Sequence, residues 1–126
     1  MIDIENGSII LVNKPYTWTS FQVVNKLKYH IKHKYGVKKF KIGHAGTLDP
    51  LATGLLIICI GKFTKRIEEF QAKEKEYTGV FRLGETTPCF DLEKPIDNEY
   101  PYLHITNEDV LRVANSFIGE IDQTPP

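Results

Sequence analysis

The chain has 126 residues, of which 41% are hydrophobic and 25% charged, so it can form one globular domain and is not a disordered or fibrous protein. The longest apolar run, residues 55–60, is too short to cross a bilayer, and no signal peptide is readable, so we expect a cytoplasmic protein without membrane contact. Net charge is zero, but residues 6–48 hold eight lysines and no acid, which indicates either a polyanionic partner or a solvated basic face.

A short strand and a long helix are predicted in the first third of the chain. Residues 9–12 are apolar and are predicted to form the strand. Pro15 ends it, because proline has no main-chain N–H to donate to a neighbouring strand. Thr19 or Ser20 then caps a helix that ends at Gly36. Its apolar stripe, at helical spacing, consists of Phe21, Val24, Leu27, Ile31 and Tyr35.

A glycine-rich loop and a central strand are predicted next. A short segment at residues 40–42 leads into residues 43–54, which carry turn chemistry throughout. Residues 55–60 are apolar on both faces, which predicts a strand in the middle of a sheet. A short helix is expected from residue 64 to residue 71.

The last third predicts a strand, an acidic connection and a helix. In residues 77–83 apolar and polar side chains alternate, which predicts a strand. Residues 84–88 are expected to form a turn, and an acidic connection then runs to about residue 101. The final helix begins near Thr106, which pairs with Asp109 in a cap, and ends at Gly119. Strands and helices without regular alternation favour an α+β fold with a mixed sheet.

The cysteines and histidines give no metal-ligand spacing. Cys59 lies inside the apolar run and reads as a buried side chain, and Cys89 has no partner motif. We therefore expect no metal site.

The loop at residues 43–54 is the unusual part of the sequence. Three glycines permit tight turns and close approach of a ligand, and Asp49 stands before Pro50, which biases its backbone to an extended conformation. Such a carboxylate can act as a nucleophile, a general base or a metal ligand, or it can cap a turn, which on chemistry alone is the commoner role. A phosphate-binding loop is disfavoured, because the Gly-Lys-Ser/Thr ending is missing and a strand follows.

Residues 43–56 resemble the nucleophile motif of the TruB-type pseudouridine synthases in their run GHAGTLDPLATGLL. Further segments resemble the family's other motifs, so that the resemblance spans essentially all 126 residues: Lys14-Pro15 with Thr19-Ser20, Gly61 with Thr64-Lys65, Lys75-Glu76-Tyr77, Arg82-Leu83-Gly84, and residues 119–123 with the final prolines. Two positions depart from the family pattern: Thr17 stands where glycine is common, and Asn13 where aspartate is common.

The resemblance implies that Asp49 attacks a uridine in the T-loop of tRNA and isomerises it to pseudouridine without a cofactor. It implies that Tyr77 stacks on the target base, that His44 helps to fill the place that the flipped base leaves, and that Gly43, Gly46 and Lys14 contribute to substrate binding. The lysines between residues 26 and 41 would contact phosphates.

The resemblance also implies that residues 1–126 are the N-terminal part of a catalytic domain with a largely antiparallel sheet and flanking helices. The C-terminal half, which in the family supplies an arginine for the nucleophile, and an RNA-binding extension are expected to be absent. We therefore expect weak or no catalysis by the 126 residues alone, no obligate protein partner, and a tendency to self-associate. The alternative is a non-catalytic RNA-binding fragment whose partner is the same T-arm.

Overall fold

The computed structural model describes residues 2–124, which fall into two compact units, one ending at Glu76 and one beginning at Tyr77. Pro125 and Pro126, which belong to the last motif of the resemblance, lie outside the described residues. Helices and antiparallel strands occur together, so the expected α+β fold with an antiparallel sheet is confirmed. Among the described residues, no helix has both the length and the apolar character that a membrane crossing needs.

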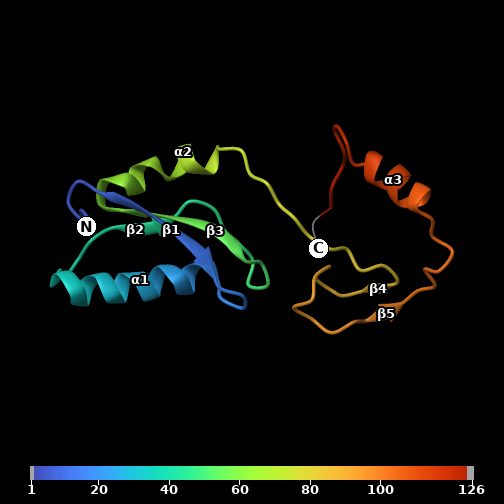
Figure 1. The fold of residues 1–126 in the computed structure, drawn as a ribbon, viewed down its shortest axis with the longest axis horizontal. Helices are drawn as coiled ribbons and strands as arrows, with labels where there is room; N and C mark the ends of the chain where they lie inside the picture. Colours follow the sequence, from blue (N-terminus) through green and yellow to red (C-terminus); the bar gives the residue numbers. More distant parts are fainter. Residues whose placement is uncertain (1, 125–126) are drawn as a thin grey trace. The chain divides into compact units, whose positions relative to one another are not determined.

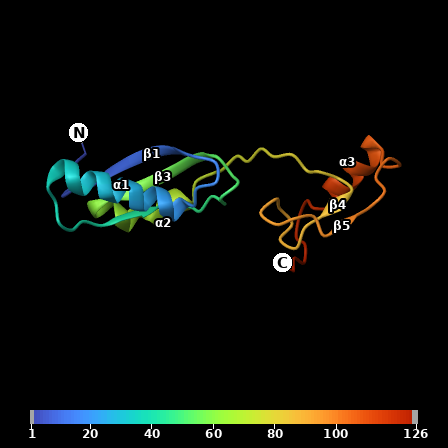
Figure 2. The ribbon, with the colours of Figure 1, turned by 90° about the horizontal axis from the view of Figure 1, so that it is seen from below.

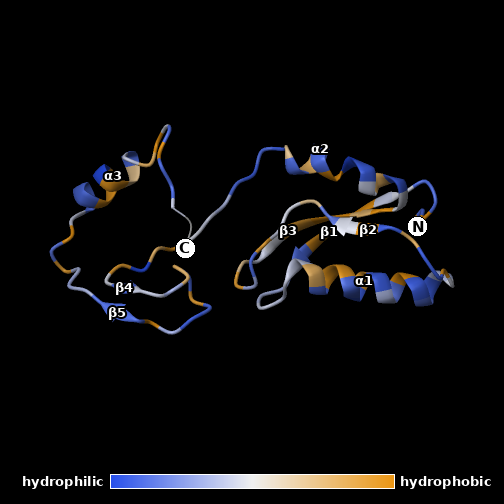
Figure 3. Cartoon of the chain, turned by 180° about the vertical axis from the view of Figure 1, so that it is seen from behind, coloured by the Kyte–Doolittle hydropathy of each residue, from blue (hydrophilic) through white to orange (hydrophobic). Residues whose placement is uncertain are grey.

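The first unit is built on a three-stranded antiparallel sheet in the order β1-β3-β2. Strand β1 (Ser8–Lys14) pairs along its whole length with β3 (Gly54–Ile60), and β2 (Ile42–His44) pairs with the other edge of β3. The apolar run therefore occupies the central strand, as predicted, and Figure 3 shows β3 as hydrophobic. The first strand extends beyond the expected residues 9–12 and includes Lys14.

Helices cover the two sides of this sheet. Helix α1 (Ser20–Tyr35) lies on one side, and a 3-10 turn (Gly61–Arg66) continued by α2 (Ile67–Gln71) lies on the other (Figures 1 and 2). Instead of the single helix expected at residues 64–71, the chain tightens into a 3-10 turn, in which the Thr64 hydroxyl donates to the Gly61 carbonyl at 2.8 Å.

Both ends of α1 follow the prediction. Thr19 is the N-cap and forms a reciprocal capping box with Gln22, and Gly36 ends the helix with a left-handed φ of 66°. Four residues of the predicted apolar stripe face the core (Val24, Leu27, Ile31 and Tyr35), but Phe21 is 66% exposed and Val23 is buried in its place. Ser20, at the start of the helix, is also buried, against the loop that precedes β3.

The core of the first unit lies between α1 and β3. Its buried members come from these two elements, and partly buried residues of β1 and β2 close its edges. The six buried members are Val23, Val24, Ile31, Leu56, Ile58 and Ile60. Each buried aliphatic side chain contributes about 1.5–3 kcal/mol of transfer free energy. This core holds β3, into which the glycine-rich loop leads, and α1, whose Ser20 contacts that loop.

The second unit has little regular structure. A two-stranded antiparallel ladder joins β4 (Glu85–Thr86) to β5 (Asn98–Glu99), and α3 (Asn107–Asn115) follows with the expected capping box of Thr106 and Asp109. Helix α3 ends at Asn115 with Ser116 as its C-cap, and not at Gly119 as expected. Beyond it the main chain continues only in turns, in which the Ser116, Phe117 and Ile118 amides donate three residues back.

The strand expected at residues 77–83 is absent from the described structure. This segment has no ladder partner, and Val80 and Phe81 are 98% and 94% exposed. Alternating apolar residues define the two faces of a possible strand, but a strand forms only where another strand accepts its main-chain hydrogen bonds. Neither β4 nor β5 pairs with it.

Candidate active site

Asp49 lies in the loop between β2 and β3, with its residue exposed to solvent. Its main-chain carbonyl accepts a hydrogen bond of 3.0 Å from the Ala52 amide, which closes a tight turn over Pro50 and Leu51. None of the hydrogen bonds described for residues 2–124 involves its carboxylate. The turn is thus closed by the backbone, and the side chain is open to a ligand from outside.

The residue before Asp49 is held by α1. Leu48 donates its amide to the Ser20 hydroxyl at 2.9 Å, and the same hydroxyl donates to the Leu48 carbonyl at 3.1 Å. Ser20 is 2% exposed, so water does not compete for these bonds. The sequence had indicated Ser20 as a candidate helix cap and as part of a family-like motif, without a contact to the loop.

The residue after Asp49 is held by the segment between β1 and α1. The Pro50 carbonyl accepts from the Thr17 amide at 2.9 Å and from the Lys14 ammonium at 3.2 Å. Thr17 reaches this carbonyl with a φ of 68°, which is rare for a β-branched residue. This conformation explains in physical terms why glycine suits the position.

Lys14 is 1% exposed, although the resemblance placed it among substrate-binding residues. Its ammonium donates to the carbonyls of Pro15, Trp18 and Pro50, so all three of its protons have acceptors on the main chain. Ion–dipole bonds of this kind compensate for the desolvation of a buried charge. In this structure Lys14 braces the loop and presents no free donor to a ligand.

His44 and two glycines form the entrance to the loop. His44 ends β2, and its Nδ1 lies 2.7 Å from the Gly46 carbonyl. A carbonyl can only accept, so Nδ1 carries the proton, and Nε2 remains available to a ligand. Gly46 has a φ of 119°, which side chains rarely adopt, and a Cβ on Gly43 would press on Ile67 at 3.1 Å.

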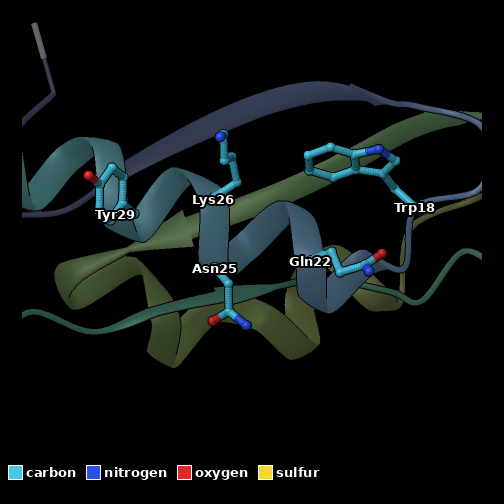
Figure 4. Close-up of a pocket in the computed structure, with 5 residues that line it drawn as sticks. All are labelled: Trp18, Gln22, Asn25, Lys26 and Tyr29. Atoms are coloured by element: carbon cyan, nitrogen blue, oxygen red, sulfur yellow. The ribbon is translucent and has the colours of Figure 1, made fainter.

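A groove runs along α1 from the loop. It has a volume of about 450 Å³ and is lined by Trp18, Gln22, Asn25, Lys26 and Tyr29. Figure 4 shows Trp18 and Tyr29 spaced along the helix with Lys26 between them. The Lys14 ammonium bonds both the Trp18 carbonyl and the Pro50 carbonyl, so the main chain of Trp18, one of the lining residues, lies beside the Asp49 loop. Sequence reasoning did not find this groove.

The structure gathers most of the predicted site within the first unit. Asp49 and His44 belong to the loop and the strand end before it, with Gly43 and Gly46 beside them, and Lys14 supports the loop from beneath. Tyr77 begins the second unit, where its side chain is 73% exposed. Within residues 2–124, no cluster of three or more His, Cys, Asp or Glu side chains has a geometry that could hold a metal ion.

Comparison with known proteins gives consistent matches. The sequence profile of a family described as "TruB family pseudouridylate synthase (N terminal domain)" matches residues 32–126. The tRNA pseudouridine synthase B of Phocaeicola vulgatus is 59% identical over 125 residues, which are 99% of this chain and 53% of the relative. That of Flavobacterium johnsoniae is 59% identical over 121 residues, which are 95% of this chain and 53% of the relative.

A more distant relative matches as widely. The tRNA pseudouridine synthase B of Chlorobium luteolum is 44% identical over 122 residues, which are 97% of this chain and 42% of the relative. The chain thus spans about half the length of the curated relatives that it matches.

Proposed function

The chain belongs to the TruB family of pseudouridylate synthases, and we propose that it carries the nucleophile, Asp49, of an enzyme that converts a T-loop uridine of tRNA to pseudouridine. The observation that carries this proposal is the exposed Asp49, whose two neighbours in the chain are both tied to the segment from Lys14 to Ser20. A carboxylate on a braced loop can meet a substrate with little loss of entropy.

The reaction is an isomerisation that needs no external reactant. The bond between N1 of uracil and C1′ of the ribose breaks, and a bond between C5 and C1′ forms. The proton on C5 is lost and N1 gains one, so atoms and electrons balance within the nucleoside. Covalent attachment of the nucleoside to the Asp49 carboxylate would hold the pieces during the exchange and divide one high barrier into two lower ones.

Two further side chains have proposed roles around the flipped uridine. His44 would help to fill the space that the extruded base leaves, with Nε2 facing the RNA because Nδ1 is bonded to Gly46. Tyr77 would stack on the uracil ring, a role for which its 73% exposed side chain is available. Because the substrate is tRNA, we propose that the protein acts in the cytoplasm.

Replacement of Asp49 by Asn in the whole protein tests the proposal. The amide retains the shape of the side chain but is a poor nucleophile, so pseudouridine formation in a T-arm hairpin should fall below detection while hairpin affinity changes less than about threefold. The matched control is Glu68→Gln, which neutralises an exposed carboxylate on α2 and should leave turnover intact. Turnover by the Asn variant at the normal rate would assign the nucleophile elsewhere.

A second candidate function, RNA binding without catalysis by these 126 residues, is favoured by the charge and the groove of α1. Residues 6–48 hold eight lysines and no acid, and the groove places Lys26 between the aromatic rings of Trp18 and Tyr29. Lysines neutralise phosphates, and exposed aromatic rings stack on unpaired bases. This combination would bind a single-stranded part of an RNA that continues along α1 from the Asp49 loop of the protein.

Binding and product measured on the same 126 residues distinguish the two candidates. If these residues only bind RNA, their affinity for a T-arm hairpin should fall steeply as the salt concentration rises, and it should be weaker in Trp18→Ala and Lys26→Gln. No pseudouridine should form. Product at a rate comparable to that of the whole protein would instead show that this chain suffices for catalysis. Trp18 is the only tryptophan in the chain, so its fluorescence reports directly on occupancy of the groove.

A further inference from the structure

The hydroxyl of Ser20 makes two hydrogen bonds to the main chain of Leu48, the residue that precedes Asp49. It accepts from the Leu48 amide at 2.9 Å and donates to the Leu48 carbonyl at 3.1 Å. These two groups belong to the peptide bonds on either side of Leu48, and the second of these peptide bonds is the one that leads into Asp49. One buried side chain therefore fixes the peptide plane that leads into Asp49, together with the plane before it.

Ser20 is suited to this task by its own fixed position. It is 2% exposed and is the first residue of α1. The next turns of the helix are anchored in the core by Val23 and Val24. The hydroxyl is thus attached to a rigid element, which transfers that rigidity to a loop that has no regular structure of its own.

Asp49 depends on such support, because none of the hydrogen bonds described for residues 2–124 orients its carboxylate. Its main chain is held on the far side by the Pro50 carbonyl, which accepts from Thr17 and Lys14. On the near side, the described hydrogen bonds to Leu48 come from Ser20 alone. Loss of the Ser20 hydroxyl would leave one side of the nucleophile free to shift.

We propose that Ser20 is a positioning residue for Asp49, acting through the main chain of Leu48 and not through contact with the RNA. This inference rests on the proposed function. A misplacement of about 1 Å in a reacting group can cost about 100-fold in rate. Ser20→Ala in the whole protein should therefore lower kcat for a T-arm hairpin by about 100-fold and change KM by less than about threefold.

Thr19→Ala is the matched control, because it damages the same helix end without touching the loop. The Thr19 side chain accepts from the Gln22 amide, so its loss weakens α1 but leaves both Leu48 bonds intact. We expect Thr19→Ala to lower the melting temperature while kcat stays within about threefold of the parent. Ser20→Thr, which restores a hydroxyl, should recover most of the activity that Ser20→Ala loses.

Amide hydrogen exchange at Leu48 supplies a readout that does not depend on activity. Without RNA, the Leu48 amide should exchange at least about tenfold faster in Ser20→Ala than in the parent, and no faster in Thr19→Ala. Equal losses of kcat in Ser20→Ala and Thr19→Ala, or an unchanged kcat in Ser20→Ala, would overturn the positioning role. Absence of product from the unmodified whole protein would instead refute the proposed function, and the positioning role with it.

Discussion

Thr17 pays a conformational cost that glycine would avoid, and replacing it should make the first unit more stable. The residue holds a φ of 68° so that its amide can reach the Pro50 carbonyl. Its side chain is exposed, and its hydroxyl takes part in none of the hydrogen bonds described for residues 2–124. Removal of the side chain therefore loses no described hydrogen bond and relieves a strained backbone.

The expected gain follows from two opposing terms. A side chain in the left-handed region costs about 1–2 kcal/mol, and the greater freedom of glycine in the unfolded chain costs about 0.5–1 kcal/mol. Thr17→Gly should thus raise the free energy of unfolding by about 0.5–1 kcal/mol, or the melting temperature by roughly 2–8 °C for a unit of this size.

Urea unfolding followed by the fluorescence of Trp18, the neighbouring residue and the only tryptophan, measures this change. Thr47→Gly is the control, since Thr47 is also an exposed threonine in an irregular segment but has no positive φ. It should lose about 0.5–1 kcal/mol. A Thr17→Gly variant that is less stable than the parent would show that the backbone at residue 17 is not strained.

Two other changes test the interior of the first unit. Lys14→Met leaves three carbonyls without their buried donor and should lower the free energy of unfolding by about 3 kcal/mol. Lys26→Met, at an exposed position, should lower it by less than about 0.5 kcal/mol. Equal urea midpoints for the two variants would contradict the bracing role of Lys14. Burial raises the pKa of the Cys59 thiol above its ordinary value of 9.0, with a smaller opposing effect of Arg66, so the folded state keeps a proton that the unfolded state loses. The stability that this provides is complete below pH 9.0 and is lost as pH rises further, so unfolding free energy should fall more steeply above pH 9.0 in the parent than in Cys59→Ala; parallel slopes would contradict it.

The elements that the sequence predicted best are those whose signals are local. Thr106 and Asp109 lie three residues apart and form the capping box that their spacing predicts, and Gly36 ends α1 because a left-handed residue is needed there. The central position of residues 55–60 also follows from local pattern, since a strand that is apolar on both faces must be covered on both.

The features that sequence reasoning missed depend on partners far along the chain. Alternation at residues 77–83 predicted a strand, but alternation does not supply a neighbouring strand. Lys14 and Ser20 form hydrogen bonds with residues that lie 36 and 28 positions further along the chain, and such contacts produce no periodic pattern in the sequence. The signals that the sequence did offer were the family-like motif at Lys14-Pro15 and Thr19-Ser20 and the departure at Thr17, where glycine is common in the family and the backbone is left-handed.

The pairing of β1 with β3 places everything that supports Asp49 within a short stretch of early sequence. Strand β1 begins at Ser8 and pairs there with Ile60, the last residue of β3. Helix α1 and the loop that carries Asp49 both lie between these two residues in the sequence. During translation this sheet can therefore assemble as soon as Ile60 has left the ribosome, while later codons are still being read. A nascent chain stalled far enough beyond Glu76 for the whole first unit to have left the ribosome should already carry the Asp49 carboxylate in the folded arrangement.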